Sequence, residues 1–431
     1  MDSIRNQQRV SGVKIADVEV LELCVPYEQR IRKQYHHFAM GEQVTVYRMH
    51  TDTGLVGLGE NPGPPLAPER LNAYVGTDPF DHMMSRGPFH LDMACYDLMG
   101  KYLGIPAWKL MGQKMRDWVA MGWWMPCMSP QDTAAEVQVA VDRGYRALKC
   151  KARAFYDIVE QSRAIQEVAP PDFRVEYDFN GALINVETAL PVLRQLESYP
   201  VVKGIEEPIF AHDTEGWRRL HQQIRIPFYL HGVNVLLEGP VRQPSGPWHA
   251  LRAGDIDGAL CSHETVRGAL AAGWTFAAAN TPILLQYVGT GITMAFACHL
   301  GAAMPTATLP GVTASHTYED DLITEPHTMH RGFVKVPQAP GLGVDLDEDA
   351  VKRYGRTSAP QWPRHISVVC LPGGIRHYYR NLQQAERLMK LGVDESFAPG
   401  VYLEEWEDDG GDRFDTIWKQ LQEDDSPIWD N

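Results

Sequence analysis

The chain has 431 residues, which is long enough for two domains or for one barrel with an added cap. Its hydrophobic fraction of 44% and charged fraction of 22% are ordinary for a globular protein, so disorder of the whole chain is not expected. A net charge of −15 argues against nucleic acid as a partner. No apolar run has the length of a signal-peptide core or a transmembrane helix, and seven cysteines without a Cys-x-x-Cys pair make no disulfide framework. We therefore expect a cytoplasmic protein with no membrane partner.

The first part of the chain predicts a small antiparallel sheet followed by helices. Short β-like runs alternate with turns, and Thr51-Asp52-Thr53-Gly54 joins two of them as a hairpin. The runs cover residues 15–25, 44–50 and 55–59. Residues 67–112 have a mostly helical pattern. Residues 26–41, between the first two strands, are rich in Arg, Lys and His, and taken alone they predict a solvated cationic loop.

From Trp118 onward, strand and helix patterns alternate, as in a parallel α/β barrel. The repeat is roughly 25 to 30 residues long, as a barrel of eight βα units requires. The expected strand ends are Trp124, Lys151, Asp178, Glu206, His231, Ser262, Gln286 and Leu309. The expected helices cover residues 131–143, 157–168, 186–197, 214–223, 264–272 and 290–303.

Several of these strand ends carry charged side chains. Asp178 and Glu206 each follow a short apolar run, so parallel strands would deliver both acids to one mouth of the barrel. Two acids placed in this way are candidate ligands for a hard cation such as Mg²⁺. Lys149 and Lys151 are two residues apart on one strand, so their ammonium groups face the same side. Packing alone does not explain this combination of charges.

The series Lys149-Cys150-Lys151, Asp178-Phe179-Asn180-Gly181 and Gly204-Ile205-Glu206-Glu207-Pro208 resembles the enolase superfamily. The likeness is to its mandelate racemase and muconate lactonizing enzyme-like members, in particular the acid-sugar dehydratase branch, and runs from about Val18 to about Tyr354. It implies a (β/α) TIM-like barrel, of the modified 7-8 type, with an α+β capping domain. It also implies a homo-oligomer that acts on a small carboxylate substrate.

The resemblance divides the chain into three parts. Residues 13–116 form the N-terminal capping domain, and residues 117–331 form the barrel. Residues 332–431 hold a segment that returns to the cap, followed by an acidic C-terminal extension. From Glu404 this extension has eleven acids against Arg413 and Lys419, with three interleaved tryptophans. We expect it to dock on the body of the protein or on a neighbouring subunit.

The resemblance gives roles to the charged strand ends. Lys151 matches the base that removes a proton α to a carboxylate, and Lys149 matches a neighbour that lowers the pKa of the base and helps to bind the substrate carboxylate. Taken alone, the pair could equally be two lysines that end a strand at the surface. Asp178 and Glu206 match two of three Mg²⁺ ligands, and the side chains expected to support them are Asn180 and Glu207.

The third metal ligand departs from the family pattern. Relatives carry an acid on the fifth strand, where this chain has either His231 or Val233, depending on the alignment. Imidazole is a poor ligand for Mg²⁺ and a good one for Zn²⁺, Fe²⁺ or Mn²⁺. The sequence therefore predicts a different divalent metal or a weak or empty site.

A second departure concerns the histidine and aspartate that act on the opposite face of the substrate in the racemase branch. Gln286 and Ser262 stand at their positions, so racemisation by two opposed bases is disfavoured. His263 and His316 are candidate substitutes, although each alone is more simply explained as a loop histidine satisfied by hydrogen bonds. The family also places the segment 26–41 over the barrel mouth. The residues there expected to contact substrate, together with Gln286, are Lys33, His36 and His37.

Three functions remain open from the sequence. The first is a lyase or isomerase, most simply an acid-sugar dehydratase with Lys151 as base, or else an epimerase or racemase of carboxylates. The second is a member of the family that has kept the fold, lost the reaction and serves as a binding protein. The third is a glycosidase that uses Glu206 and Glu207. It is the weakest candidate, because adjacent residues of a strand point to opposite sides.

Overall fold

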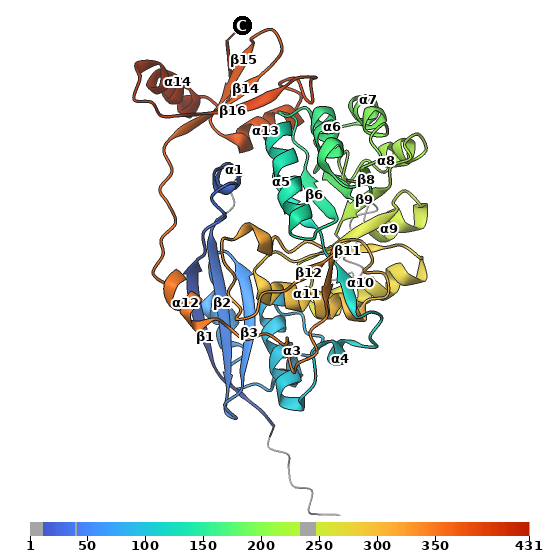
Figure 1. Ribbon diagram of the computed structural model, residues 1–431, viewed down its shortest axis with the longest axis vertical. Helices are drawn as coiled ribbons and strands as arrows, with labels where there is room; N and C mark the ends of the chain where they lie inside the picture. The colour runs from blue at the N-terminus through green and yellow to red at the C-terminus, as the bar shows by residue number, and fades with distance from the viewer. Residues whose placement is uncertain (1–11, 39–40, 233–246, 431) are drawn as a thin grey trace, which may run out of the picture.

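The computed structural model describes residues 12–38, 41–232 and 247–430. The chain forms a cap, a parallel barrel and a separate C-terminal layer that sits over one side of the barrel (Figure 1). This arrangement confirms the predicted barrel with an α+β cap. No helix in these three ranges is long and apolar enough to span a bilayer.

The cap is built on an antiparallel sheet in the order β1-β2-β3, formed by β1 (Ile15–Cys24), β2 (Gln43–Thr51) and β3 (Val56–Pro62). The sheet packs against α3 (Phe89–Leu103). Glycine makes this contact close, since a Cβ atom at Gly57 would lie 2.4 Å from the carbonyl oxygen of Ala94. The remaining helices of the cap are α2 (Pro68–Asn72), η1 (Pro79–His82) and α4 (Trp108–Met111).

The segment between β1 and β2 is not the solvated loop that its composition predicts. It contains the short helix α1 (Arg32–His37), in which Tyr35 and His37 are buried. The hydroxyl of Tyr35 donates to the carbonyl oxygen of Trp124 at 3.1 Å. The apolar and aromatic residues of the segment therefore tie it to the barrel, which its cationic composition conceals.

The barrel is a seven-stranded parallel sheet in the order β11-β10-β9-β8-β7-β6-β5. Its strands are β5 (Trp123–Met125), β6 (Ala147–Lys151), β7 (Arg174–Asp178), β8 (Val202–Glu206), β9 (Phe228–His231), β10 (Gly258–Ser262) and β11 (Ile283–Gln286). In place of an eighth strand, two isolated bridges close the circle, from Met121 to Gly311 and from Gln286 to Val312. The eighth strand end was expected near Leu309, just before these bridges.

Helices cover the outside of this sheet. They are α5 (Pro130–Asp142), α6 (Ile158–Val168), α7 (Val186–Leu196), α8 (Thr214–His221), α9 (Pro247–Ala253), α10 (Val266–Ala278) and α11 (Gly291–Ala303). Most begin where a short polar side chain accepts a hydrogen bond from the first turn, which fixes the start of the helix. The capping residues are Ser129, Asp157, Asn185, Asp213 and Thr265.

After the barrel, the chain returns to the cap. A small sheet in the order β12-β13-β4 joins β12 (Met329–His330) and β13 (Phe333–Lys335) to β4 (Trp118–Ala120). A glycine turn then docks on α3, where the buried Asp97 accepts a hydrogen bond from the backbone of Leu342 at 2.8 Å. The helix α12 (Glu348–Tyr354) follows.

Residues 365–430, here called the C-terminal unit, form a four-stranded antiparallel sheet in the order β16-β14-β15-β17. The strands are β14 (His365–Cys370), β15 (Arg376–Tyr379), β16 (Tyr402–Glu407) and β17 (Ile428–Asp430), and the helices are α13 (Leu382–Lys390) and α14 (Asp412–Glu423). A hydrophobic cluster separate from the main core joins its sheet to α14. An extended segment after α12 leads to it, and it lies beside α1 and α5 (Figure 1).

Candidate active site

The charged strand ends of the barrel form one cluster. In the sheet register, Lys151 stands opposite Asp178, and Asp178 stands opposite Glu206. Lys149 stands one layer deeper, opposite Glu176. Because alternate residues of a strand share a face, this register directs all five side chains into the barrel. Lys149, Asp178 and Glu206 are at most 2% exposed.

The two lysines contact the two acids directly. The Lys149 ammonium group pairs with Glu206 and lies 3.8 Å from the Oδ2 atom of Asp178. The Lys151 ammonium group pairs with Asp178 and donates a second hydrogen bond, of 2.9 Å, to the Oδ1 atom of Asn180. The structure thus brings together the four charged residues singled out in the sequence. Within this set, Lys151 is the lysine that reaches solvent, with 15% of its side chain exposed.

The charges of the cluster stabilise one another. Burial alone would raise the pKa of Asp178, but Lys151 and Lys149 together lower it to about 2. Burial alone would lower the pKa of Lys149, yet Glu206, Asp178 and Glu176 raise it above its ordinary value. Asp178 is therefore a carboxylate and Lys149 an ammonium ion at neutral pH.

The described residues do not fit a Mg²⁺ site. They supply two carboxylates and the imidazole of His231, whose Nδ1 atom lies 2.8 Å from Glu206 Oε1. Within the described ranges, Asp178, Glu206 and His231 do not bring one ligand atom each within 4.8 Å of one another. Ammonium groups contact the carboxylate oxygens that an ion would need. Val233, the alternative third position, lies outside the described residues.

Gln286 and Ser262 stand side by side where the family places its second base. The amide nitrogen of Gln286 donates to the hydroxyl of Ser262 at 3.2 Å, and its oxygen accepts a hydrogen bond of 2.6 Å from Lys149. An amide and a hydroxyl cannot take up a proton at neutral pH. This face of the site can therefore orient Lys149 or a substrate but cannot act as a base.

The histidines proposed as substitute acids or bases make other contacts. His263 accepts a hydrogen bond of 3.1 Å from the backbone of Val288, and burial lowers its pKa to about 4. His316 stacks on Trp123 with 3.7 Å between ring centroids, and burial lowers its pKa to about 3. Neither of these contacts involves a lysine of the cluster. Each histidine is occupied in the local packing of the barrel.

The residues of α1 expected to contact substrate face the C-terminal unit instead. The ammonium group of Lys33 lies 2.5 Å from a carboxylate oxygen of Glu407. His36 stacks on Trp362, and His37 lies against His365 with 4.4 Å between ring centroids. The physical reason is that the C-terminal unit covers α1. The docking of the C-terminal extension on the body was expected, but its position over α1 was not.

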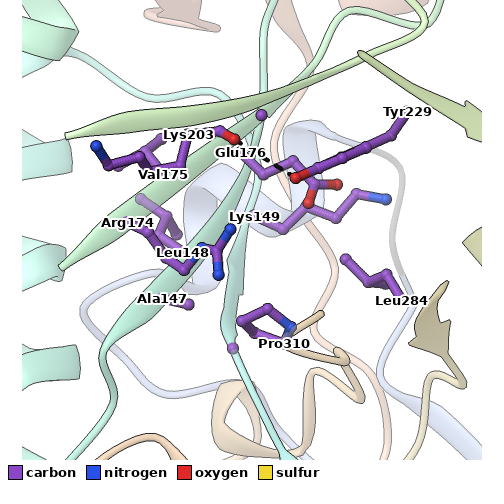
Figure 2. A pocket seen from close by; sticks show the side chains of 12 residues that line it. Ala147, Leu148, Lys149, Arg174, Val175, Glu176, Lys203, Tyr229, Leu284 and Pro310 are labelled. Carbon is purple, nitrogen blue, oxygen red and sulfur yellow. Dashed lines mark hydrogen bonds between the residues drawn. The ribbon is translucent and has the colours of Figure 1, made fainter. Parts of the chain in front are cut away.

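Two residues of the site were missed in the sequence. Glu176 is buried beside Lys149, and burial raises the pKa of its carboxyl group to about 8. Figure 2 shows both residues on neighbouring strands, around a narrow cavity inside the barrel that Tyr229 also lines. Arg153 is 4% exposed and donates to Asn180 Oδ1 at 3.2 Å. Glu176 is two positions before Asp178 on the same strand, so the alternation along a strand could have identified it, whereas Arg153 lies in the loop after β6.

The turns that follow the strand ends are conformationally constrained. Asn180, Glu207 and His263 have φ angles of 46°, 43° and 52°, a region that residues other than glycine rarely adopt. Each lies one or two residues beyond a strand of the barrel. Such backbone is retained where the surrounding structure holds it, commonly at functional sites. Glu207 is half-buried, and burial raises its pKa.

Comparison with known proteins places the chain in a family. A family model described as "Enolase C-terminal domain-like" matches residues 132–350. D-gluconate dehydratase of Thermoproteus tenax is 25% identical over 393 residues, which are 79% of this chain and 74% of that protein. D-galactonate dehydratase of Ralstonia nicotianae is 25% identical over 367 residues, 73% of this chain and 91% of that protein. o-Succinylbenzoate synthase of Geobacillus stearothermophilus is 28% identical over 283 residues, 61% of this chain and 68% of that protein.

Solved structures share the fold. An enolase from Mycobacterium smegmatis complexed with tartrate superposes with a TM-score of 0.66 at 21% identity, over 80% of this chain and 92% of that one. The family model matches half of the chain, and dehydratases are among the relatives. The cap and barrel have the same fold as the solved structures. The chain is a member of the enolase superfamily.

Proposed function

We propose that this enolase-superfamily enzyme removes a proton α to the carboxylate of an acid-sugar substrate and eliminates water, with Lys151 as the base. The observation that supports it is the pair Lys149 and Lys151, set on one strand against Asp178 and Glu206 at the barrel mouth. The relatives named above as dehydratases support the substrate class.

The two lysines take different roles in this proposal. Lys149 is buried and held as an ammonium ion, so it supplies fixed positive charge to the carboxylate and enolate of the substrate. Lys151 lies two residues further along the same strand and accepts the α proton in this proposal. Asp178 and Asn180 hold Lys151 in position until substrate enters.

Elimination also needs an acid for the departing hydroxyl group. His231 ends β9 at the same mouth, is 35% exposed, and is oriented by Glu206. In the proposed step, Lys151 takes the α proton, the C–H electron pair forms the enol double bond, and the β C–O bond breaks. His231 donates a proton to the departing oxygen, which leaves as water. Gln286 and Ser262 restrict proton removal to one face.

The test is a screen of acid sugars in deuterated water, with and without added Mg²⁺, Mn²⁺ or Zn²⁺. We expect a 2-keto product or stereospecific exchange at the α carbon. Lys151→Ala should lower the rate by about 10²- to 10⁴-fold, the usual contribution of a general base. Lys203→Ala is the matched control, because Lys203 is exposed and lies near the start of its strand, away from the barrel mouth. Unchanged turnover in Lys151→Ala, or exchange from both faces, would contradict the assignment.

A second candidate function is a binding protein that has kept the site without the reaction. The direct pairing of Lys149 and Lys151 with the acids favours it, since a paired ammonium group is no base. Calorimetry separates the two candidates. Binding of an acid sugar that Lys149→Met abolishes, without turnover by the folded wild-type protein, would favour the binding protein.

A further inference from the structure

Apart from the barrel mouth, the described residues bring two histidines and a glutamate together where α1 meets the C-terminal unit. His37 is the last residue of α1, His365 is the first residue of β14, and Glu405 lies within β16. Each offers one ligand atom, and these atoms lie within 4.8 Å of one another. The strands β14 and β16 are paired, which fixes two of the three residues on one sheet.

The separations within this cluster are too long for hydrogen bonds. His37 Nδ1 lies 3.8 Å from Glu405 Oε1, and His365 Nε2 lies 3.8 Å from Glu405 Oε2. Ligand atoms bound at about 2.0–2.1 Å to a tetrahedral Zn²⁺ ion lie about 3.3 Å apart. A small inward movement of the three side chains would therefore place them around one ion.

Neighbouring groups orient two of the three side chains. The hydroxyl of Ser367 donates to both carboxylate oxygens of Glu405, at 3.1 Å each. The imidazole of His365 bonds the backbone of Pro363, which has only a carbonyl to offer, so the other ring nitrogen keeps its lone pair. A metal-bound histidine usually carries this kind of second contact.

The ring of His37 has no such support. It is buried, with 7% of its side chain exposed, and its Nδ1 atom lies 3.8 Å from Glu405 Oε1. A cation bound between these two groups would bring both within bonding distance of one centre.

We propose that His37, His365 and Glu405 bind one Zn²⁺ ion, which joins the cap to the C-terminal unit. Two imidazoles and one carboxylate suit Zn²⁺ and disfavour Mg²⁺ or Ca²⁺, and three protein ligands leave a fourth position for water. This site is distinct from Asp178 and Glu206. It does not depend on the reaction proposed for the barrel.

The test is Zn²⁺ titration of untagged, chelator-treated protein, followed by metal analysis after gel filtration. Wild-type protein should retain one equivalent and show a higher Tm with Zn²⁺. His365→Ala and Glu405→Gln should each lose that equivalent and the Tm shift. Glu405→Gln keeps the shape of the side chain and so guards against misfolding. His330→Ala, at the exposed end of β12, should behave as wild type.

Asp178→Asn separates this site from the barrel mouth. We expect Asp178→Asn to retain the Zn²⁺ equivalent. When Co²⁺ replaces Zn²⁺, Asp178→Asn should show the visible absorption of a tetrahedral site, and His365→Ala should not. No retained Zn²⁺ in wild-type protein would overturn the proposal. So would Zn²⁺ that survives both His365→Ala and Glu405→Gln, or that only Asp178→Asn removes.

Discussion

At the scale of single residues, the most informative side chain is one that the sequence analysis overlooked. Glu176 shares a layer of the barrel with Lys149 and has Gly204 on its other side. The space above that glycine is taken by the ring of Tyr229, since a Cβ atom at Gly204 would lie 2.3 Å from it. Glu176 is thus enclosed by protein, and its carboxyl group gains little from solvent.

This enclosure predicts a pH dependence. The pKa of Glu176 is about 8 in the folded chain and near 4.5 when unfolded, so between these values the folded state alone holds the proton. The free energy of unfolding should therefore fall, by on the order of 5 kcal/mol for this group, as the pH rises from about 4.5 to 8. Glu176→Gln stays neutral and should remove that loss. Urea unfolding at several pH values measures the difference.

Glu187→Gln is the control for this experiment, because Glu187 is 88% exposed. It should leave the slope of stability against pH unchanged. If Glu176→Gln and the wild-type protein lose stability in parallel over this window, Glu176 is ionised at neutral pH and the assignment fails.

At the scale of elements, α13 of the C-terminal unit contacts the loop that follows β6. Its Glu386 pairs with Arg153 at 3.0 Å, and Arg153 shares the Oδ1 atom of Asn180 with Lys151. Nearby, the backbone of Phe397 donates to the carbonyl oxygen of Ala154 at 2.8 Å. The loop after β6, which carries Arg153, is therefore held by a segment outside the barrel.

We predict that Glu386→Gln lowers kcat/KM for the acid-sugar substrate by about 10- to 100-fold, because a displaced Arg153 misplaces Asn180 and Lys151. Glu386→Asp should restore part of the loss. Glu395→Gln, at an exposed position of the same segment, is the control. Circular dichroism and the Tm distinguish positioning from unfolding, since the variant should keep both while its kcat/KM falls. An unchanged kcat/KM would remove Glu386 from the site.

The agreement between the predicted and the observed elements varies along the chain. Strands β6 to β11 end at the expected residues, because buried parallel strands are short apolar runs stopped by a polar side chain. Two expected strands differ: β5 ends at Met125 rather than Trp124, and isolated bridges replace the strand expected to end at Leu309. The C-terminal unit was not predicted as a sheet, and the partners of α1 were not predicted either. Contacts such as Lys33 with Glu407 join residues far apart in the chain, and no local pattern records them.

At the scale of the whole molecule, the C-terminal unit has its own small core and yet is held at several points. The backbone of Gly400 donates to Asp157 at the start of α6, at 2.7 Å. Phe397 packs on Phe179, just beyond β7, with 5.5 Å between ring centroids. The unit contacts both α1 and the loops of the barrel mouth, so cap, barrel and unit are linked around the site.

The position of α1 has a consequence for kinetics. Tyr35 ties the helix to the barrel, while Lys33 and His36 tie it to the C-terminal unit. A helix held on both sides opens slowly, so we expect product escape rather than bond breaking to limit turnover. The kcat for an acid-sugar substrate should then fall in proportion to solvent viscosity when sucrose is added. Lys33→Ala removes the ion pair with Glu407, so its kcat should be less sensitive to viscosity. A wild-type kcat that does not change with viscosity would mean that the chemical step limits turnover.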